Sequence, residues 1–280
     1  MSVFEATVLG IVQGLTEFLP ISSSGHLVLV QALFQLREPM VAFDVALHWA
    51  SLLALLMYFW KDIFRMIRDT LIFLFRLPHS RDREALLQEY PMAIASGLVI
   101  LATFPTLMIG FVFKDSFEAM FGSVPATAIS WIVMSGVLFA CGRLQAGDRA
   151  IASMNHFDAF IIGVAQGISI IPAISRSGAT IFAALLLGIE KKEAARFSFL
   201  LAIPAILGAG ILEMKEGLAF WEASPGPLAA GFITSAIVSY LTIHLLLDIL
   251  RRAKFHLFGF YTLAAGILTL IYYFLTRTVS

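Results

Sequence analysis

Long apolar runs constrain the fold of this chain more than any other feature of its sequence. Each approaches the roughly 20 residues that a helix needs to cross a hydrocarbon core about 30 Å thick. The six runs cover residues 41–60, 92–113, 124–142, 197–212, 228–249 and 257–275. Charged residues make up only 14% of the 280, whereas soluble domains carry about 25%. The sequence therefore predicts an all-α polytopic membrane protein.

Two further apolar regions, residues 3–34 and 158–188, are interrupted by polar segments at 20–26 and 172–180. The arms on either side of each interruption are too short for comfortable spans. Irregular backbone is stable at membrane depth only where protein buries it or where it lines a cavity. We therefore predict two re-entrant helix–loop–helix pairs. Residues 63–77 mix arginines with aromatics, and we expect this segment to lie at the membrane interface.

The two interrupted regions repeat each other without a gap. Gln13 aligns with Gln166 and Gly25 with Gly178, and both pairs are 153 residues apart. Three predicted spans separate the regions, so the copies enter the membrane from opposite faces, as in inverted-topology repeats. We predict a single membrane domain, 1–280, with a first repeat at 1–142 and a second at 154–280. Each repeat comprises one re-entrant pair and three transmembrane helices.

The placement of lysine and arginine predicts the orientation in the membrane. Fourteen of these residues fall on the predicted loops 61–90, 143–157, 189–196 and 250–256, which share one face. The opposite face carries four: Arg37, Lys114, Lys215 and Arg277. Because basic loops stay in the cytoplasm, we expect both termini and the mouth of the first re-entrant pair to face outward. The formal net charge is zero, so no overall field would attract nucleic acid, and we expect none as a partner. The apolar runs predict membrane lipids as partners.

The first interruption combines a carboxylate with a cluster of small polar residues. Glu17 lies inside an apolar arm, where an ionisable group is costly and indicates function. Ser22, Ser23, Ser24, Gly25 and His26 then open the second arm. The free N–H groups and the dipole at the start of a helix favour an anion there. We therefore predict an anion-binding site in the first repeat.

The second interruption offers similar chemistry with an added cation. Its candidate binding residues are Ser175, Ser177, Gly178 and Thr180, beside Arg176. Two helix starts with an arginine between them suit a phosphate or a diphosphate. A serine-rich break can also be a simple helix cap, but its repetition together with Arg176 favours a binding site. Gln13 in the first arm is a further candidate for substrate binding.

The two copies are not chemically equivalent. Glu17 and His26 of the first correspond to Ile170 and Ala179 of the second. A binding cradle needs neither an acid nor an imidazole, whereas a hydrolase needs a nucleophile and a proton-transfer group. This asymmetry favours an enzyme. The alternative is a transporter or flippase for a phosphorylated lipid, since broken helices in inverted repeats are common in transporters. We interpret His48, in a predicted span, as a packing histidine.

Residues 13–26, the loop 172–180 and residues 195–204 together resemble the undecaprenyl-diphosphate phosphatase (bacitracin-resistance) family, and the similarity covers nearly the whole chain. The resemblance implies hydrolysis of undecaprenyl diphosphate, a polyprenyl diphosphate lipid, to undecaprenyl phosphate and phosphate. This reaction recycles the carrier lipid for cell-wall synthesis in the bacterial cytoplasmic (inner) membrane, with the active site toward the outer leaflet. The resemblance also implies a divalent cation, Mg²⁺ or Ca²⁺. A carboxylate with substrate phosphates suits Mg²⁺, so we expect Glu17 to hold the metal.

Two positions depart from the family pattern. Many members have glutamate where this chain has Gln13, and many have glycine where it has Ala173. The first departure leaves Glu17 as the expected carboxylate for metal binding or acid–base chemistry. The second is expected to tighten the loop that follows Pro172.

The catalytic hypothesis assigns four residues. Ser23 attacks the terminal phosphorus, and His26 or Glu17 handles the proton. Arg176 stabilises charge on the equatorial oxygens. His26 as the nucleophile stays an alternative. A homodimer is a further hypothesis for the assembly.

Overall fold

The computed structural model describes residues 1–36, 40–80, 82–121, 123–144, 147–223, 225–252 and 254–278. Arg37 lies outside the described residues, as do the side chains of Lys215 and Arg277. Within the described ranges the chain forms helices and no strand, apart from an isolated bridge between Arg149 and Ile189. Five helices are long and apolar enough to cross a membrane, and a bent pair makes a sixth candidate. The prediction of an all-α polytopic membrane protein is confirmed.

The candidate spans coincide with the apolar runs of the sequence. They are α3 (Val41–Tyr58), α6 (Pro91–Val112), α8 (Val124–Cys141), α11 (Lys191–Ala223), α12 (Pro225–Arg251) and α13 (Leu257–Thr278). Helix α11 begins six residues before the expected span at 197, because a charged first turn is compatible with a helix although it lowers the hydropathy. Helix α3 ends two residues early, and the chain bends there by 73° into α4 (Trp60–Arg76).

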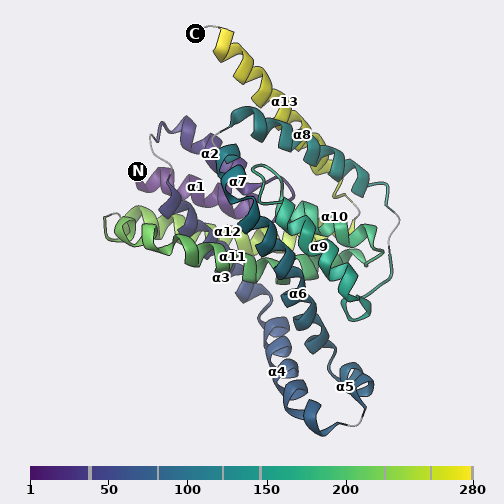
Figure 1. Ribbon diagram of the computed structural model, residues 1–280. Helices are drawn as coiled ribbons and strands as arrows, with labels where there is room; N and C mark the ends of the chain where they lie inside the picture. Colours follow the sequence, from purple (N-terminus) through teal and green to yellow (C-terminus); the bar gives the residue numbers. More distant parts are fainter. Residues whose placement is uncertain are drawn as a thin grey trace.

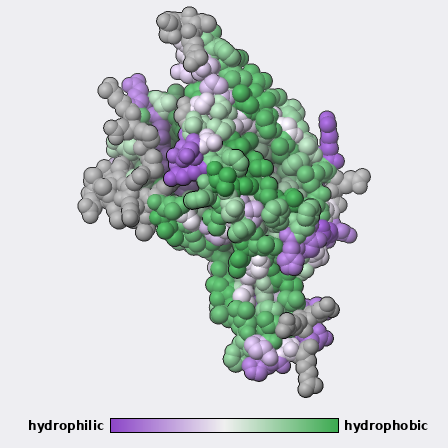
Figure 2. Space-filling model, viewed as in Figure 1, coloured by the Kyte–Doolittle hydropathy of each residue, from purple (hydrophilic) through white to green (hydrophobic). Residues whose placement is uncertain are grey.

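Helix α4 runs beside α6 and projects from the body of the molecule, with α5 (Arg83–Glu89) near its far end (Figure 1). One side of α4 exposes large apolar side chains at helical spacing, namely Phe64, Ile67, Leu71, Leu74 and Phe75. Figure 2 shows apolar surface continuing from the body along this projection, with hydrophilic residues gathered at its tip. The interfacial location of residues 63–77 stays a prediction.

Each interrupted region consists of two short helices. The first holds α1 (Val3–Thr16) and α2 (Ser23–Leu33), and the second holds α9 (His156–Ile168) and α10 (Arg176–Leu186). The non-helical segments are therefore 17–22 and 169–175, a few residues earlier than the sequence indicated. Ser23 and Arg176 already lie in first helical turns, because the serines before them occupy the N-cap positions. Re-entry through one membrane face stays a prediction.

The packing of the helices follows the internal repeat. Helix α1 packs along α12, and its counterpart α9 packs along α6, the counterpart of α12. Helix α3 packs against α11, and α8 against α13, so these helices pair with their own counterparts. This exchange of partners is the arrangement expected of two interlocked copies. The boundaries at 1–142 and 154–280 stay predictions.

Equivalent glycines allow both exchanged contacts. A Cβ atom on Gly10 of α1 would lie 2.5 Å from the carbonyl oxygen of Gly231 in α12. A Cβ atom on Gly163 of α9 would lie 2.1 Å from the carbonyl oxygen of Ala102 in α6. Small residues let helix backbones approach closely where lipid surrounds the bundle. These glycines therefore set the position of the arms that lead into both breaks.

Replacing Gly163 by alanine is expected to lower the free energy of unfolding by about 1–3 kcal/mol, because a methyl group there forces two backbones apart. Thermal unfolding in detergent, followed by circular dichroism, measures the effect. Gly97→Ala in α6 is the matched control, since its added methyl group would meet nothing within 4 Å. Alanine favours a helix over glycine, so this control should keep or slightly raise the melting temperature. Equal melting temperatures for both variants would contradict the close-contact explanation.

Candidate active site

The carboxylate of Glu17 is the centre of a buried polar cluster. Glu17 is the C-cap residue of α1 and is 8% exposed. Its Oε2 atom accepts hydrogen bonds from Ser23 Oγ at 2.7 Å and from Gln13 Nε2 at 3.0 Å. The guanidinium of Arg176 donates to Oε1 and forms an ion pair. A buried carboxylate is tolerated when it is paired and hydrogen-bonded in this way, and the pair joins the two interrupted regions.

The first turn of α10 positions Arg176. Ser175 is the N-cap residue, and its Oγ accepts from the N–H of Gly178 at 3.2 Å. The same hydroxyl donates to the carbonyl oxygen of Leu19 in the first break at 3.4 Å. Ser177 Oγ lies 3.1 Å from Ser175 Oγ. The second break is thereby attached to the first, with Arg176 directed toward Glu17.

Both breaks contain a residue with a left-handed backbone. Ser22 has a φ angle of 69° and Ala173 one of 64°. This conformation costs residues with a Cβ atom about 1–2 kcal/mol, and it persists only where surrounding packing enforces it. Ala173 is fully buried. Glycine adopts positive φ without this cost, so Ala173 occupies a position whose backbone conformation suits glycine.

His26 lies beside the Glu17 cluster but bonds to other groups. Its Nδ1 atom is 2.6 Å from the carbonyl oxygen of Ser22, and its Nε2 atom is 2.6 Å from the hydroxyl of Tyr261 in α13. Trp131 of α8 packs edge-on against the imidazole and donates from Nε1 to the carbonyl oxygen of Ile21 at 2.9 Å. The described bonds of His26 are therefore directed toward its own loop and α13.

The remaining candidates stabilise the local structure. Ser24 Oγ lies 3.2 Å from Ser22 Oγ. Gly25 leaves room for Trp131, since a Cβ atom would lie 2.5 Å from the indole ring. Thr180 Oγ1 lies 2.5 Å from Ser198 Oγ of α11 and donates to the carbonyl oxygen of Arg176 at 2.8 Å. The structure thus joins four of the predicted residues in one bonded cluster: Gln13, Glu17, Ser23 and Arg176.

Two neighbours of the site were not assigned to it from the sequence. His48 Nε2 lies 3.6 Å from Glu17 Oε2, while its Nδ1 is 2.7 Å from the carbonyl oxygen of Asp44. The interpretation of His48 as a packing residue thus missed its contact with the carboxylate. An ionisable residue in a predicted span was the available signal. Tyr261 is 235 residues from His26, and no sequence pattern connected them.

Oxygen atoms around Glu17 suit a hard divalent cation. The buried Oε1 atom of Gln13 has no hydrogen-bond partner among the described residues. Carboxylate and amide oxygens are the ligands that Mg²⁺ and Ca²⁺ prefer. In the described part of the chain, no cluster of three or more His, Cys, Asp or Glu residues could hold a metal ion. A cation at this position would therefore complete its coordination with substrate phosphates or water.

The fold and the site define an integral multi-pass membrane protein with a serine–carboxylate–arginine cluster between two broken helical regions. The chain matches the family described as bacitracin resistance protein BacA over residues 6–268, and it belongs to that family.

Relatives of similar length carry one shared name. A protein of Methanosphaera stadtmanae named undecaprenyl-diphosphatase is 40% identical to this chain, over 97% of this chain and 98% of that protein. Proteins of the same name from Carboxydothermus hydrogenoformans and Halothermothrix orenii are each 38% identical. Those two alignments cover 97% of this chain and 97% and 98% of the relatives, respectively. The family expected from the sequence is confirmed.

Proposed function

We propose that this protein is a membrane phosphatase that hydrolyses undecaprenyl diphosphate to undecaprenyl phosphate and phosphate, and so recycles the carrier lipid for cell-wall synthesis. The full-length similarity to proteins named undecaprenyl-diphosphatase supports the substrate. The observation that carries the proposal is the cluster at Glu17. Its two oxygens bond to the hydroxyl of Ser23, 2.7 Å away, and to the guanidinium of Arg176.

Ser23 is the proposed nucleophile and Glu17 the proposed base. The Ser23 oxygen bonds to the terminal phosphorus, its proton passes to Glu17 Oε2, and the bridging P–O bond breaks to release undecaprenyl phosphate. Glu17 passes that proton to the departing phosphate oxygen, and then takes a proton from the water that attacks the phosphoserine. It returns this proton to the Ser23 oxygen as the Ser23 O–P bond breaks and phosphate leaves. The sequence left the base open between Glu17 and His26. The 2.7 Å contact favours Glu17, because the described bonds of His26 go elsewhere.

The positive charge of Arg176 and the start of α2 are the proposed phosphate-binding groups. When substrate binds, the guanidinium of Arg176 would direct one edge, with two N–H groups, to the phosphate in place of Glu17. Two parallel N–H···O bonds from such an edge suit phosphate oxygens. Helix α2 begins without a side-chain cap, whereas Ser175 caps α10. An uncapped helix start leaves its first N–H groups for an anion. The substrate phosphates are therefore expected at the start of α2.

The proposal includes a divalent cation, Mg²⁺ or Ca²⁺, held by Glu17 and the unpartnered Oε1 of Gln13. When bound, the cation neutralises charge on the diphosphate. The family resemblance implies a location in the bacterial cytoplasmic (inner) membrane. The lysine and arginine distribution supports an orientation with the site toward the outer leaflet and both termini outside. A homodimer stays a prediction, which the mass of the purified protein in nanodiscs would test.

Purified protein in detergent is expected to release phosphate from undecaprenyl diphosphate, to stop when EDTA is added, and to recover with excess Mg²⁺ or Ca²⁺. The reason is that Glu17 adds negative charge beside the diphosphate, and the single positive charge of Arg176 does not offset both. Phosphate release is followed colorimetrically, and circular dichroism before and after EDTA is the control for folding. Folded protein that releases no phosphate with any added cation would overturn the phosphatase. Transfer of labelled lipid between vesicle leaflets would then support the transport alternative.

A further inference from the structure

Both ring nitrogens of His26 have hydrogen-bond partners. Nδ1 bonds to the backbone of Ser22, and Nε2 bonds to the side chain of Tyr261 in α13. A carbonyl oxygen can only accept, so the 2.6 Å contact with Ser22 requires a hydrogen on Nδ1. The tautomer of the neutral ring is therefore fixed, and Nε2 carries the lone pair. That lone pair faces the Tyr261 hydroxyl at 2.6 Å. Tyr261 donates to the neutral ring and can accept from the charged ring, so this bond persists in both protonation states.

Two aromatic residues enclose the imidazole. Trp131 is fully buried and lies edge-on, with ring centroids 5.4 Å apart and an interplanar angle of 70°. Its bond to the carbonyl oxygen of Ile21 and its contact with Gly25 prevent it from shifting. The Tyr261 ring lies nearly parallel to the imidazole, at 12° with centroids 5.6 Å apart. Trp131 restricts the ring by packing, whereas Tyr261 also fixes it through a directional hydrogen bond.

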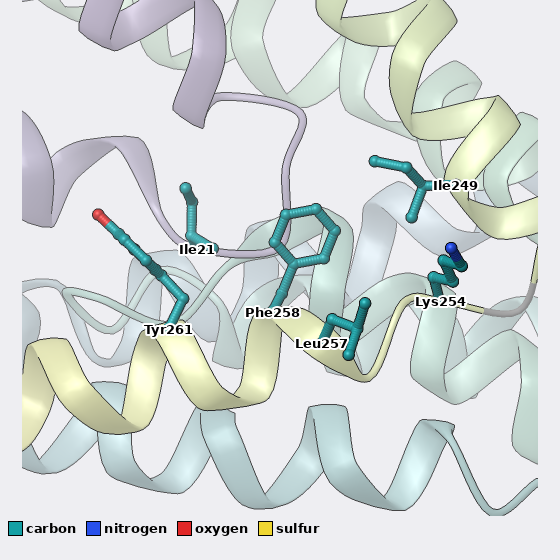
Figure 3. A pocket seen from close by; sticks show the side chains of 6 residues that line it. All are labelled: Ile21, Ile249, Lys254, Leu257, Phe258 and Tyr261. Atoms are coloured by element: carbon teal, nitrogen blue, oxygen red, sulfur yellow. The ribbon is translucent and has the colours of Figure 1, made fainter.

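The other side of Tyr261 faces open space. An apolar pocket of about 370 Å³ is lined by Ile21, Ile249, Lys254, Leu257, Phe258 and Tyr261. Figure 3 shows the Tyr261 ring at one end of this group, with its hydroxyl pointing away from Leu257 and Lys254. Tyr261 is 48% exposed. Removing its hydroxyl therefore creates no buried cavity, and Tyr261→Phe changes the hydrogen bond while keeping the ring contact.

We propose that Tyr261 is the positioning residue for His26, and that its hydroxyl, bonded to Nε2, keeps the ring oriented so that Nδ1–H holds the carbonyl oxygen of Ser22 beside the proposed nucleophile Ser23. The inference rests on the proposed phosphatase, in which Ser23 is the nucleophile and Glu17 the base. Tyr261 acts through His26 and needs no contact with the reacting phosphate. It lies in the last helix of the second repeat, so this bond completes the first-repeat site with a group from the other copy.

Kinetics separate positioning from packing. Tyr261→Phe is expected to lower kcat about 10-fold and to leave KM within about 2-fold, because the hydrogen bond that orients His26 against the turn before Ser23 is lost. Tyr272→Phe is the matched control, since Tyr272 lies on the same helix and is 65% exposed. In the His26→Ala background, Tyr261→Phe should cause no further loss. An equal loss in both backgrounds would overturn the proposal and indicate a packing role.

A spectroscopic test does not depend on turnover. The chain has six histidines, and ¹⁵N-histidine spectra assigned with His26→Gln identify the His26 nitrogens. Tyr261→Phe should shift the His26 Nε2 resonance to the value of an unbonded nitrogen, while Nδ1 stays protonated. An unchanged Nε2 resonance would overturn the inference even if wild-type protein releases phosphate. If the wild-type protein releases no phosphate but Tyr261→Phe shifts the Nε2 resonance as expected, the phosphatase proposal is rejected and the positioning of His26 by Tyr261 is retained. If His26→Ala is inactive, the kinetic comparison in that background gives no result, and the Nε2 resonance alone tests whether Tyr261 positions His26.

Discussion

Replacing Glu17 by glutamine is expected to reduce phosphate release by roughly 10³-fold, because general-base catalysis contributes about 10²–10⁴-fold and glutamine cannot accept the proton of Ser23. Glutamine keeps the length of the side chain and can still bond to Ser23 and Arg176. The loss should therefore appear in kcat more than in KM. Steady-state phosphate release at saturating cation measures it, and single-turnover reactions should show no phosphoserine.

A second buried ion pair provides the control for Glu17. Asp158 is 3% exposed and bonds to Arg149 at 2.5 Å, near the start of α9. Asp158→Asn makes the same chemical change in a similarly buried pair outside the Glu17 cluster. It is expected to lower the melting temperature and to keep release per folded molecule. Parallel losses of activity and stability in both variants would show that Glu17 has a structural role only.

Replacing Arg176 by alanine is expected to reduce kcat/KM for phosphate release by about 10²–10³-fold, the usual cost of removing a group that stabilises developing charge. Arg176→Lys should retain part of the activity, since lysine keeps the charge but lacks the planar fork that binds two phosphate oxygens. Initial rates over a range of undecaprenyl diphosphate concentrations measure both variants. Full activity in Arg176→Ala would remove Arg176 from the proposed mechanism.

Loss of Arg176 also leaves a buried carboxylate unpaired, which destabilises a protein by about 3–5 kcal/mol. The double variant Glu17→Gln with Arg176→Ala separates this effect from catalysis. It should recover stability relative to Arg176→Ala, because no unpaired charge is left, and it should stay inactive. Arg149→Ala is the arginine control, since it breaks the pair with Asp158 and is expected to leave release per folded molecule unchanged.

The sequence was informative wherever a structural requirement is local. The six spans followed from apolar length, because a hydrocarbon core selects helices of about 20 residues. Both breaks followed from polar residues within apolar regions, although the helices resume at Ser23 and Arg176 within the expected interruptions. Hydropathy marks the membrane environment and does not mark the ends of helices, which explains why α11 begins at Lys191.

The residue types of the site were also predictable, and the repeat identified which of them are unique to one copy. Glu17 and His26 have no chemical equivalents in the second copy, and this asymmetry selected them. Which of the two handles the proton of Ser23 was not predictable. Ser23 and Glu17 are six residues apart, yet only the turn through Ser22 shows that the hydroxyl reaches the carboxylate instead of the imidazole.

The sequence by itself determined the class of protein, the helices, the breaks and the polar residues within them, because apolar length, helix capping and the cost of buried charge act over a few residues. The tertiary structure decided which of those residues meet. Arg176 reaches Glu17 across 159 residues, and Tyr261 reaches His26 across 235. Such contacts depend on how α1, α10 and α13 pack, and each packing contact involves surfaces that lie far apart in the chain.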